Sequence, residues 1–180
     1  MKNEITGMRL RLIVMNFLQF AVWGAYLTSM GTYLFNIGLG AKIGLFYAMQ
    51  GIVSLFMPAI MGIIADRWVP AQKLYGFCHF MAAVFMVAAG WYGYVDGEAV
   101  NFGTLFTFYS LSVAFYMPTL ALTNSVAYTA LDKVKLDPVI AFPPIRIFGT
   151  IGFICSMLLT DILGFQNNYM QFFSCACFGV

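Results

Sequence analysis

The stretch FPPIRIFGTIGF, residues Phe142 to Phe153, places one charged side chain, Arg146, inside an otherwise uncharged apolar segment. A cation at the depth of the lipid hydrocarbon costs at least a few kcal/mol, and such residues usually face an internal cavity or a partner. At helical spacing, Thr150 follows four residues later and Phe153 seven, so the three side chains share one face. A guanidinium, a hydroxyl and an aromatic ring on one face suit a small polar ligand that has a flat ring.

A second interpretation of Arg146 is equally open from this segment alone. The residue stands two positions after Pro144. A long cationic side chain near the end of a span can reach the lipid headgroups while its apolar stem stays in the hydrocarbon. A ligand-binding role and a membrane-anchor role therefore both fit the pattern.

The whole chain around this stretch is apolar. Of its 180 residues, 62% are hydrophobic and 9% are charged, whereas a typical soluble domain has about 25% charged residues. Uncharged gaps cover residues 12–41, 43–65, 74–95 and 99–131, and each reaches the ~20 residues that a helix needs to cross the hydrocarbon core. The alternation typical of a membrane β-barrel is absent. The sequence predicts an all-α polytopic membrane protein.

Six apolar segments follow one another, and we place their boundaries at about residues 12–35, 43–65, 74–94, 102–128, 138–160 and 169–180. In the fifth, Asp137 followed by Pro138 is typical of an N-cap and a first helical residue. At 1.5 Å per residue the sixth covers only about 18 Å of a ~30 Å core. We therefore expect the last helix to be truncated and the chain to be a fragment of a longer protein.

The first segment carries a polar and aromatic stripe made of Asn16, Gln19, Trp23 and Tyr26, at spacings of three, four and three residues. Polar side chains at this depth point into the bundle, where they either bond a neighbouring helix or line a water-filled path. Both interpretations stay open for Gln19 and Trp23.

The fourth segment contains YMPTLALTN, residues Tyr116 to Asn124. Pro118 removes a backbone donor, so we predict that the helix is interrupted there, and Pro143-Pro144 predicts a similar break in the fifth segment. Irregular polar backbone at membrane depth borders protein or a cavity, not lipid.

No catalytic or metal-ligating constellation is found in the sequence. It contains no Ser/His/Asp set, no HExxH motif and neither glycine-rich phosphate loop, so we expect no enzymatic activity, no metal and no cofactor. The single histidine, His79, is interpreted as a hydrogen-bonded structural residue, with proton carriage as the alternative. The cysteines are interpreted as small buried hydrophobes: Cys78, Cys155, Cys175 and Cys177.

The charged residues predict an orientation but no nucleic-acid partner. The net charge is only +2 and the basic residues are spread thinly among loop ends. With the N-terminus in the cytoplasm, the outer side holds only Lys42, a bias that fixes orientation by the positive-inside rule. The cytoplasmic side then holds Lys2, Arg9, Arg11, Arg67, Lys73, Lys133 and Lys135.

Four stretches together resemble the nucleoside:proton symporter family of the major facilitator superfamily. They are FLQFAVWGAYLTSMGTYLF at 17–35, FMPAIMGIIADRW at 56–68, YMPTLALTN at 116–124 and FPPIRIFGTIGF at 142–153. The resemblance covers nearly the whole chain and corresponds to that family's N-terminal six-helix bundle. It implies that residues 1–180 are one such bundle in the plasma membrane of a bacterium (the inner membrane), without the C-terminal bundle.

One loop also fits the superfamily pattern G-x-x-x-D-R-x-G. Gly62, Asp66 and Arg67 match it, whereas Val69 replaces the second glycine. An acid at such a membrane boundary can pair with a basic group or with a helix N-terminus across the loop.

The resemblance further implies roles for single residues. Arg146, Thr150 and Phe153 match the family's nucleoside contacts in this half. Cavity-lining positions are Gln19 and Trp23, by the family's first-helix pattern, and Tyr116 and Asn124, from the polar fourth segment. The function implied is proton-coupled nucleoside symport by alternating access. The partners are then the nucleoside, protons, the lipid bilayer and the missing C-terminal bundle, which also holds the remaining ligand contacts and the proton-carrying carboxylate.

Three alternatives remain beside this interpretation. They are half of a carrier for another small polar solute such as a sugar, a membrane-embedded enzyme, and a scaffold bundle that transports nothing. An enzyme would need a paired acid and base or a metal cluster at membrane depth, and the sequence shows none.

Overall fold

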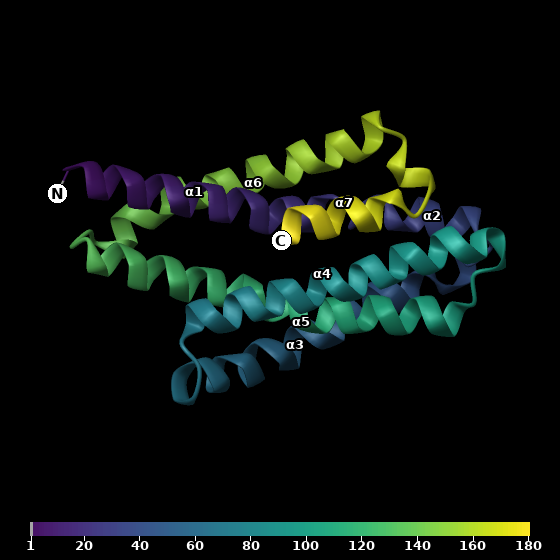
Figure 1. Cartoon of the computed structure of the whole chain (residues 1–180), viewed down its shortest axis with the longest axis horizontal. Helices are drawn as coiled ribbons and strands as arrows, with labels where there is room; N and C mark the ends of the chain where they lie inside the picture. Colours follow the sequence, from purple (N-terminus) through teal and green to yellow (C-terminus); the bar gives the residue numbers. More distant parts are fainter. Residues whose placement is uncertain (1) are drawn as a thin grey trace.

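The computed structural model describes residues 2–180, in which every regular element is helical (Figure 1). Met1, the first residue of the predicted 1–180 bundle, lies outside the described residues. Five helices are long and apolar enough to cross a membrane, counted over the described part of the chain. They are α1 (Lys2–Gly24), α3 (Ile43–Arg67), α4 (Ala71–Asp96), α5 (Phe102–Lys133) and α6 (Pro138–Ile162). Two shorter helices are α2 (Met30–Asn36) and α7 (Met170–Gly179), and 3-10 turns occur at Gly40–Lys42, Gly97–Ala99 and Phe165–Asn167.

The helices form two groups joined by α7. Helix α1 packs along α6, and α5 packs between α3 and α4. Helix α7 contacts both α1 and α4, so it bridges the groups (Figure 1). The main core lies between them and includes the buried rings of Tyr26, Phe46, Tyr109 and Phe172.

Glycines bring α1 and α6 into direct backbone contact. A side chain at Gly24 would collide with the backbone oxygen of Phe153, and one at Gly152 with the backbone of Phe17. Small residues on facing helices allow this close approach, which gives van der Waals contact along the seam. The glycines therefore set the distance at which the polar residues of α6 face α1.

The first predicted span, residues 12–35, is divided rather than continuous. Helix α1 ends at Gly24, and residues 25–29 form turns before α2 begins at Met30. The hydroxyls of Ser29 and Thr160 each lie 3.3 Å from the carbonyl oxygen of Ala25. Polar side chains that satisfy freed backbone groups make such a break tolerable inside a membrane.

The predicted interruptions at the prolines are wrong. Pro118 lies inside continuous α5, and Pro143 and Pro144 lie inside continuous α6. In a protein buried in lipid, packing against neighbouring helices offsets the hydrogen bond that each proline removes. The predicted start of α6 is confirmed, because the backbone N–H of Val139 donates to the Asp137 carboxylate at 2.9 Å.

The cysteines also differ from expectation. Cys78 and Cys175 are buried, but Cys155 and Cys177 are exposed on the surface of the bundle. A helix at the edge of a bundle has one outward face, and these two residues occupy it on α6 and α7.

Candidate functional site

Helix α6 is continuous through Arg146, Thr150 and Phe153, so its period places the three residues on one face. Arg146 and Phe153 are partly buried, and Thr150 is exposed. Because the helix runs unbroken from Pro138, Arg146 lies about 12 Å along its axis from that end and about 24 Å from Ile162. The cation therefore sits well inside the span, not in its first turn.

The Arg146 side chain runs toward the middle of the helix. A Cβ placed on Gly149 would lie 2.8 Å from Arg146 Nη1 and 2.6 Å from Cδ2 of Phe20. The guanidinium thus lies over Gly149, three residues closer to the C-terminal end of α6. An anchor would point the other way, because the nearer helix end and its headgroups lie toward Pro138. This direction favours a role inside the bundle.

The ring of Phe20 on α1 covers the guanidinium. The central carbon of the Arg146 guanidinium lies 3.9 Å from the Phe20 ring centroid. Such a cation–π contact contributes about 0.5–2 kcal/mol, more when water is excluded. The acids of these two helices, Glu4 and Asp161, stand roughly 20 Å or more away along the axes, so this charge meets a ring rather than a carboxylate of α1 or α6.

The aromatic contact continues along the α1–α6 seam. The rings of Phe20 and Trp23 are 6.4 Å apart, and those of Trp23 and Phe153 are 6.3 Å apart at 83°. These are favourable tilted and edge-to-face geometries. The indole N–H of Trp23 is buried and has no acceptor among the described residues. We call Phe20, Trp23, Arg146 and Phe153 the seam site; its donors are the guanidinium and this N–H.

Gln19, the residue next to Phe20, has a different environment. It is fully buried, and its amide nitrogen donates to Thr119 Oγ1 at 2.8 Å. Its amide oxygen accepts from the Tyr75 hydroxyl at 2.8 Å and from Thr123 at 3.0 Å, and His79 Nε2 lies 2.7 Å from it. We call this cluster the Gln19 hub; it ties α1 to α4 and α5.

The Gln19 hub also borders a cavity. Gln19, Tyr75 and His79 line a space of about 320 Å³, together with residues 178–180 at the end of α7. Of the two interpretations of Gln19, hydrogen bonding to neighbouring helices is therefore observed, and lining of a water-filled path stays a prediction. The histidine is part of the same hydrogen-bonded cluster.

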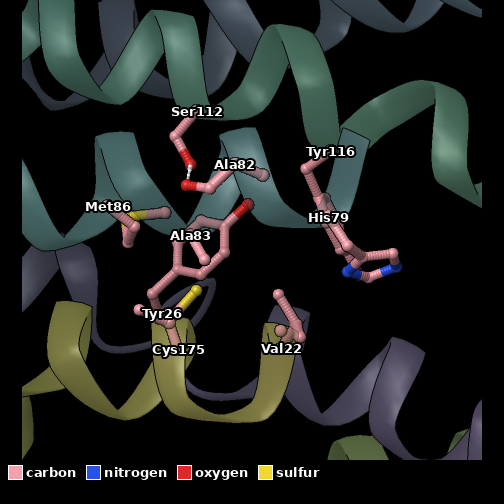
Figure 2. Close-up of a pocket in the computed structure, with 11 residues that line it drawn as sticks. Val22, Tyr26, His79, Ala82, Ala83, Met86, Ser112, Tyr116 and Cys175 are labelled. Carbon is pink, nitrogen blue, oxygen red and sulfur yellow. Dashed lines mark hydrogen bonds between the residues drawn. The ribbon is translucent and has the colours of Figure 1, made fainter. Parts of the chain in front are cut away.

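Tyr116 belongs to the hub side of the bundle. Its hydroxyl donates to the backbone oxygen of Gln19 at 2.5 Å, and the residue is 2% exposed. With Tyr26 and His79 it lines an enclosed cavity of about 10 Å³, shown in Figure 2. A space of that size holds at most one water molecule, so it is not a solute pocket. Asn124, the other predicted cavity residue of α5, is exposed.

The loop-motif residues lie where α3 ends. Asp66 and Arg67 are exposed in its last turn, and Gly62 is one turn earlier. The backbone N–H groups of Trp68 and Val69 both donate to the Ile64 carbonyl at 3.0 Å. This closes the helix before α4 begins at Ala71.

The sequence analysis did not single out Phe20, which contacts Arg146, or Thr123, which donates to the Gln19 amide oxygen. Phe20 is three residues before Trp23, a spacing that places both on one side of α1, but its partner Arg146 is on another helix. Only the glycine pattern of α6, with Gly149 and Gly152 following Arg146, hinted at a helix in close contact.

The chain is similar to known membrane transport proteins over most of its length. The family described as "Nucleoside H+ symporter" matches residues 6–179. The xanthosine permease of Escherichia coli (strain K12) is 40% identical over 166 residues, covering 91% of this chain and 38% of that protein. The nucleoside permease NupG of the same organism is 38% identical over 170 residues, covering 93% of this chain and 39% of that protein.

The fold is also similar to a solved structure. A crystal structure of the nucleoside transporter NupG superposes with a TM-score of 0.87 at 37% identity, over 96% of this chain and 41% of that one. The expected all-α fold of a major facilitator half-bundle is thereby confirmed. The chain spans about two fifths of the length of the relatives that it matches.

Proposed function

The chain belongs to the nucleoside H+ symporter family, and from that premise we propose that the protein containing it carries nucleosides across a membrane together with protons, by alternating access. The relatives are named as permeases and transporters, not as enzymes. Carriers of this kind bind solute near the bilayer midplane, between two bundles that rock about it. This chain would supply one of the bundles.

The observation that supports the proposal best is the position of Arg146. Its guanidinium points toward mid-helix and has a ring, not a carboxylate, as its neighbour in the seam. We propose that it donates hydrogen bonds to hydroxyls or base carbonyls of the nucleoside, each worth on the order of 1.5 kcal/mol or more. Thr150 adds a polar contact, and Phe153 packs on the planar base.

The coupling proton is proposed to use a carboxylate outside this chain. Every acid here stands at or near a helix end or in a connecting turn: Glu4, Asp66, Asp96, Glu98, Asp132, Asp137 and Asp161. A proton relay at membrane depth needs an ionisable group inside the bundle. In line with the family resemblance, we propose that this carboxylate and the remaining ligand contacts lie in a C-terminal bundle.

The chain is a multi-pass membrane protein, and we propose the bacterial inner membrane with the N-terminus in the cytoplasm. In that orientation seven lysines and arginines face the cytoplasm and only Lys42 faces outward. Cysteines introduced by Asn167→Cys and Lys133→Cys, in a background without the native cysteines, are expected to react with an impermeant reagent from opposite sides. Labelling of Lys133→Cys from outside intact cells would reverse the orientation. No nucleic acid and no cofactor enter this proposal.

Uptake by vesicles tests the proposed function. The full-length protein, reconstituted into lipid vesicles, is expected to accumulate labelled uridine or xanthosine, and an inward proton gradient is expected to raise that uptake. Empty vesicles are the control. Uptake of a sugar without uptake of either nucleoside would assign the other solute class, and no uptake of any solute would favour the scaffold.

A further inference from the structure

We propose that Phe20 is a positioning residue for substrate binding: its ring packs against the Arg146 guanidinium, and the N–H donors are left to the ligand. The inference rests on the proposed function, because it assigns Phe20 a part in the binding of the same substrate. Phe20 acts through Arg146 and does not itself need to touch the nucleoside.

The contact between Phe20 and Arg146 is close. With its central carbon 3.9 Å from the ring centroid, the guanidinium is in close contact with the Phe20 ring. A π contact uses the charge of the cation and consumes none of the five N–H donors. Arg146 is thereby fixed in place with its hydrogen-bonding capacity intact, which is the arrangement that binding a neutral polar solute requires.

The contact also uses space that Gly149 leaves free on α6. Gly149 lies directly beneath the Phe20 ring and the guanidinium. A side chain at this position would collide with both the ring and Arg146 Nη1 unless they moved. At the neighbouring Gly152, the α6 backbone lies directly against the backbone of Phe17, so the two helices are in close contact there. A glycine at position 149 thus makes room for a cation lying along α6 under a ring from α1.

The same side of α1 makes a second aromatic contact with α6. Trp23, one turn after Phe20, meets Phe153 edge to face. Phe20 and Trp23, two of the aromatic residues of α1, therefore both contact residues of α6 that are proposed to touch the nucleoside. Arg146 and Phe153 on α6 are thus positioned by the rings of Phe20 and Trp23 on α1.

The test measures uridine binding and uptake by full-length variants, with membrane insertion checked separately. Phe20→Leu removes the π face, and the dissociation constant is expected to rise about 3- to 10-fold. Phe20→Tyr keeps the ring and is expected to bind like the parent protein. Phe17→Leu is the matched control, since Phe17 is a partly buried phenylalanine of the same helix, and its binding is expected to be unchanged.

A double-variant cycle separates positioning from direct contact. In an Arg146→Ala background, Phe20→Leu is expected to have no further effect, because the group that it positions is gone. An equal loss in both backgrounds would show that the ring acts on the substrate without Arg146. Unchanged binding by Phe20→Leu, where Arg146→Ala does weaken binding, would also overturn the proposal. If Phe20→Leu does not insert, Phe20→Met replaces it.

A readout without substrate keeps this inference apart from the proposed function. The side-chain NMR resonance of Arg146, assigned by its loss in Arg146→Lys, is expected to show a ring-current shift that disappears in Phe20→Leu and remains in Phe20→Tyr. A shift that is insensitive to Phe20→Leu contradicts the contact itself. Absence of nucleoside binding by the parent protein would instead remove the proposed function, whatever the resonance shows.

Discussion

Gln19 and Phe20 are consecutive residues of α1, yet they belong to regions of different character. The Gln19 hub joins three helices with hydrogen bonds that use both ends of its amide. The seam site holds a guanidinium without a carboxylate of its two helices and an indole N–H without an acceptor among the described residues. One turn of α1 thus presents a satisfied polar network to one side and unused donors to the other.

This difference separates structural polar groups from functional ones. Buried polar groups are normally hydrogen-bonded, and a satisfied network makes the packing specific. Donors that are positioned but left without partners carry a cost of about 1–3 kcal/mol each when buried. We propose that a ligand offsets this cost for the Trp23 N–H at the seam site, whereas the hub holds α1, α4 and α5 together. Each variant below bears on one side of that contrast.

The largest effect is expected from separating the chain from a second bundle. The 180-residue chain by itself is expected to insert and remain helical, because the hub and the aromatic core are contained within it. It is expected to show no substrate-specific uptake in vesicles, because alternating access needs two bundles. Uptake by this chain alone, measured beside the full-length protein, would end the half-carrier interpretation.

Loss of the guanidinium comes next. Arg146→Ala in the full-length protein is expected to weaken uridine binding by at least about tenfold, since hydrogen bonds from a charged donor contribute about 1.5–3 kcal/mol. Arg146→Lys keeps the charge but not the planar fork, so a large loss is expected there too. A properly inserted Arg146→Lys protein with near-normal affinity would return the residue to the role of membrane anchor.

The hub should respond in the opposite manner. Gln19→Leu is expected to lower thermal stability, because Thr119, Tyr75 and Thr123 lose a shared partner. Interhelical hydrogen bonds in membranes contribute about 0.6 kcal/mol on average and up to about 1.7. Uridine affinity of the folded fraction is expected to change less than in Arg146→Ala. If Gln19→Leu left the melting temperature intact but abolished binding, Gln19 would move to the substrate site.

The smallest effect is expected from Trp23→Phe, which keeps an aromatic ring against Phe153 and removes only the indole N–H. A weakening of uridine binding by a few-fold is expected, consistent with a net hydrogen bond of about 0.5–1.5 kcal/mol. Trp23→Leu, which also removes the ring, serves as the comparison and is expected to bind more weakly. Equal binding by Trp23→Phe and the parent protein would mean that this N–H is not a ligand donor.

Much of the architecture follows from the spacing of charges along the chain. Uncharged gaps such as 43–65 and 74–95 predict spans because a charge in hydrocarbon is costly over the ~20 residues of a crossing. The resulting boundaries lie close to α3 and α4 as observed. The stripe of Arg146, Thr150 and Phe153 is equally local, because a continuous helix fixes it by its period.

The low helix propensity of proline gave wrong predictions where packing against neighbouring helices decides whether a helix continues. Pro118 and Pro143-Pro144 predicted breaks that tertiary packing removes, whereas a real break follows Gly24. That break is supported by the hydroxyl of Thr160 on α6, which lies close in space to the Ala25 carbonyl but 135 residues away in sequence. A pattern confined to one helix does not contain this partner.

The sequence by itself determined a helical membrane bundle, the approximate ends of spans such as α3 and α4, and a cation on the same helix face as Thr150 and Phe153. Only the tertiary structure decided that Phe20 covers that cation, that Gln19 bonds α4 and α5, and that Arg146 points toward mid-helix. The physical reason is the range of the interactions. Helix period and the cost of charge in lipid act within one segment. The ring and guanidinium contacts depend instead on how closely glycines let α1 and α6 approach, and the Gln19 amide contacts depend on partners from α4 and α5.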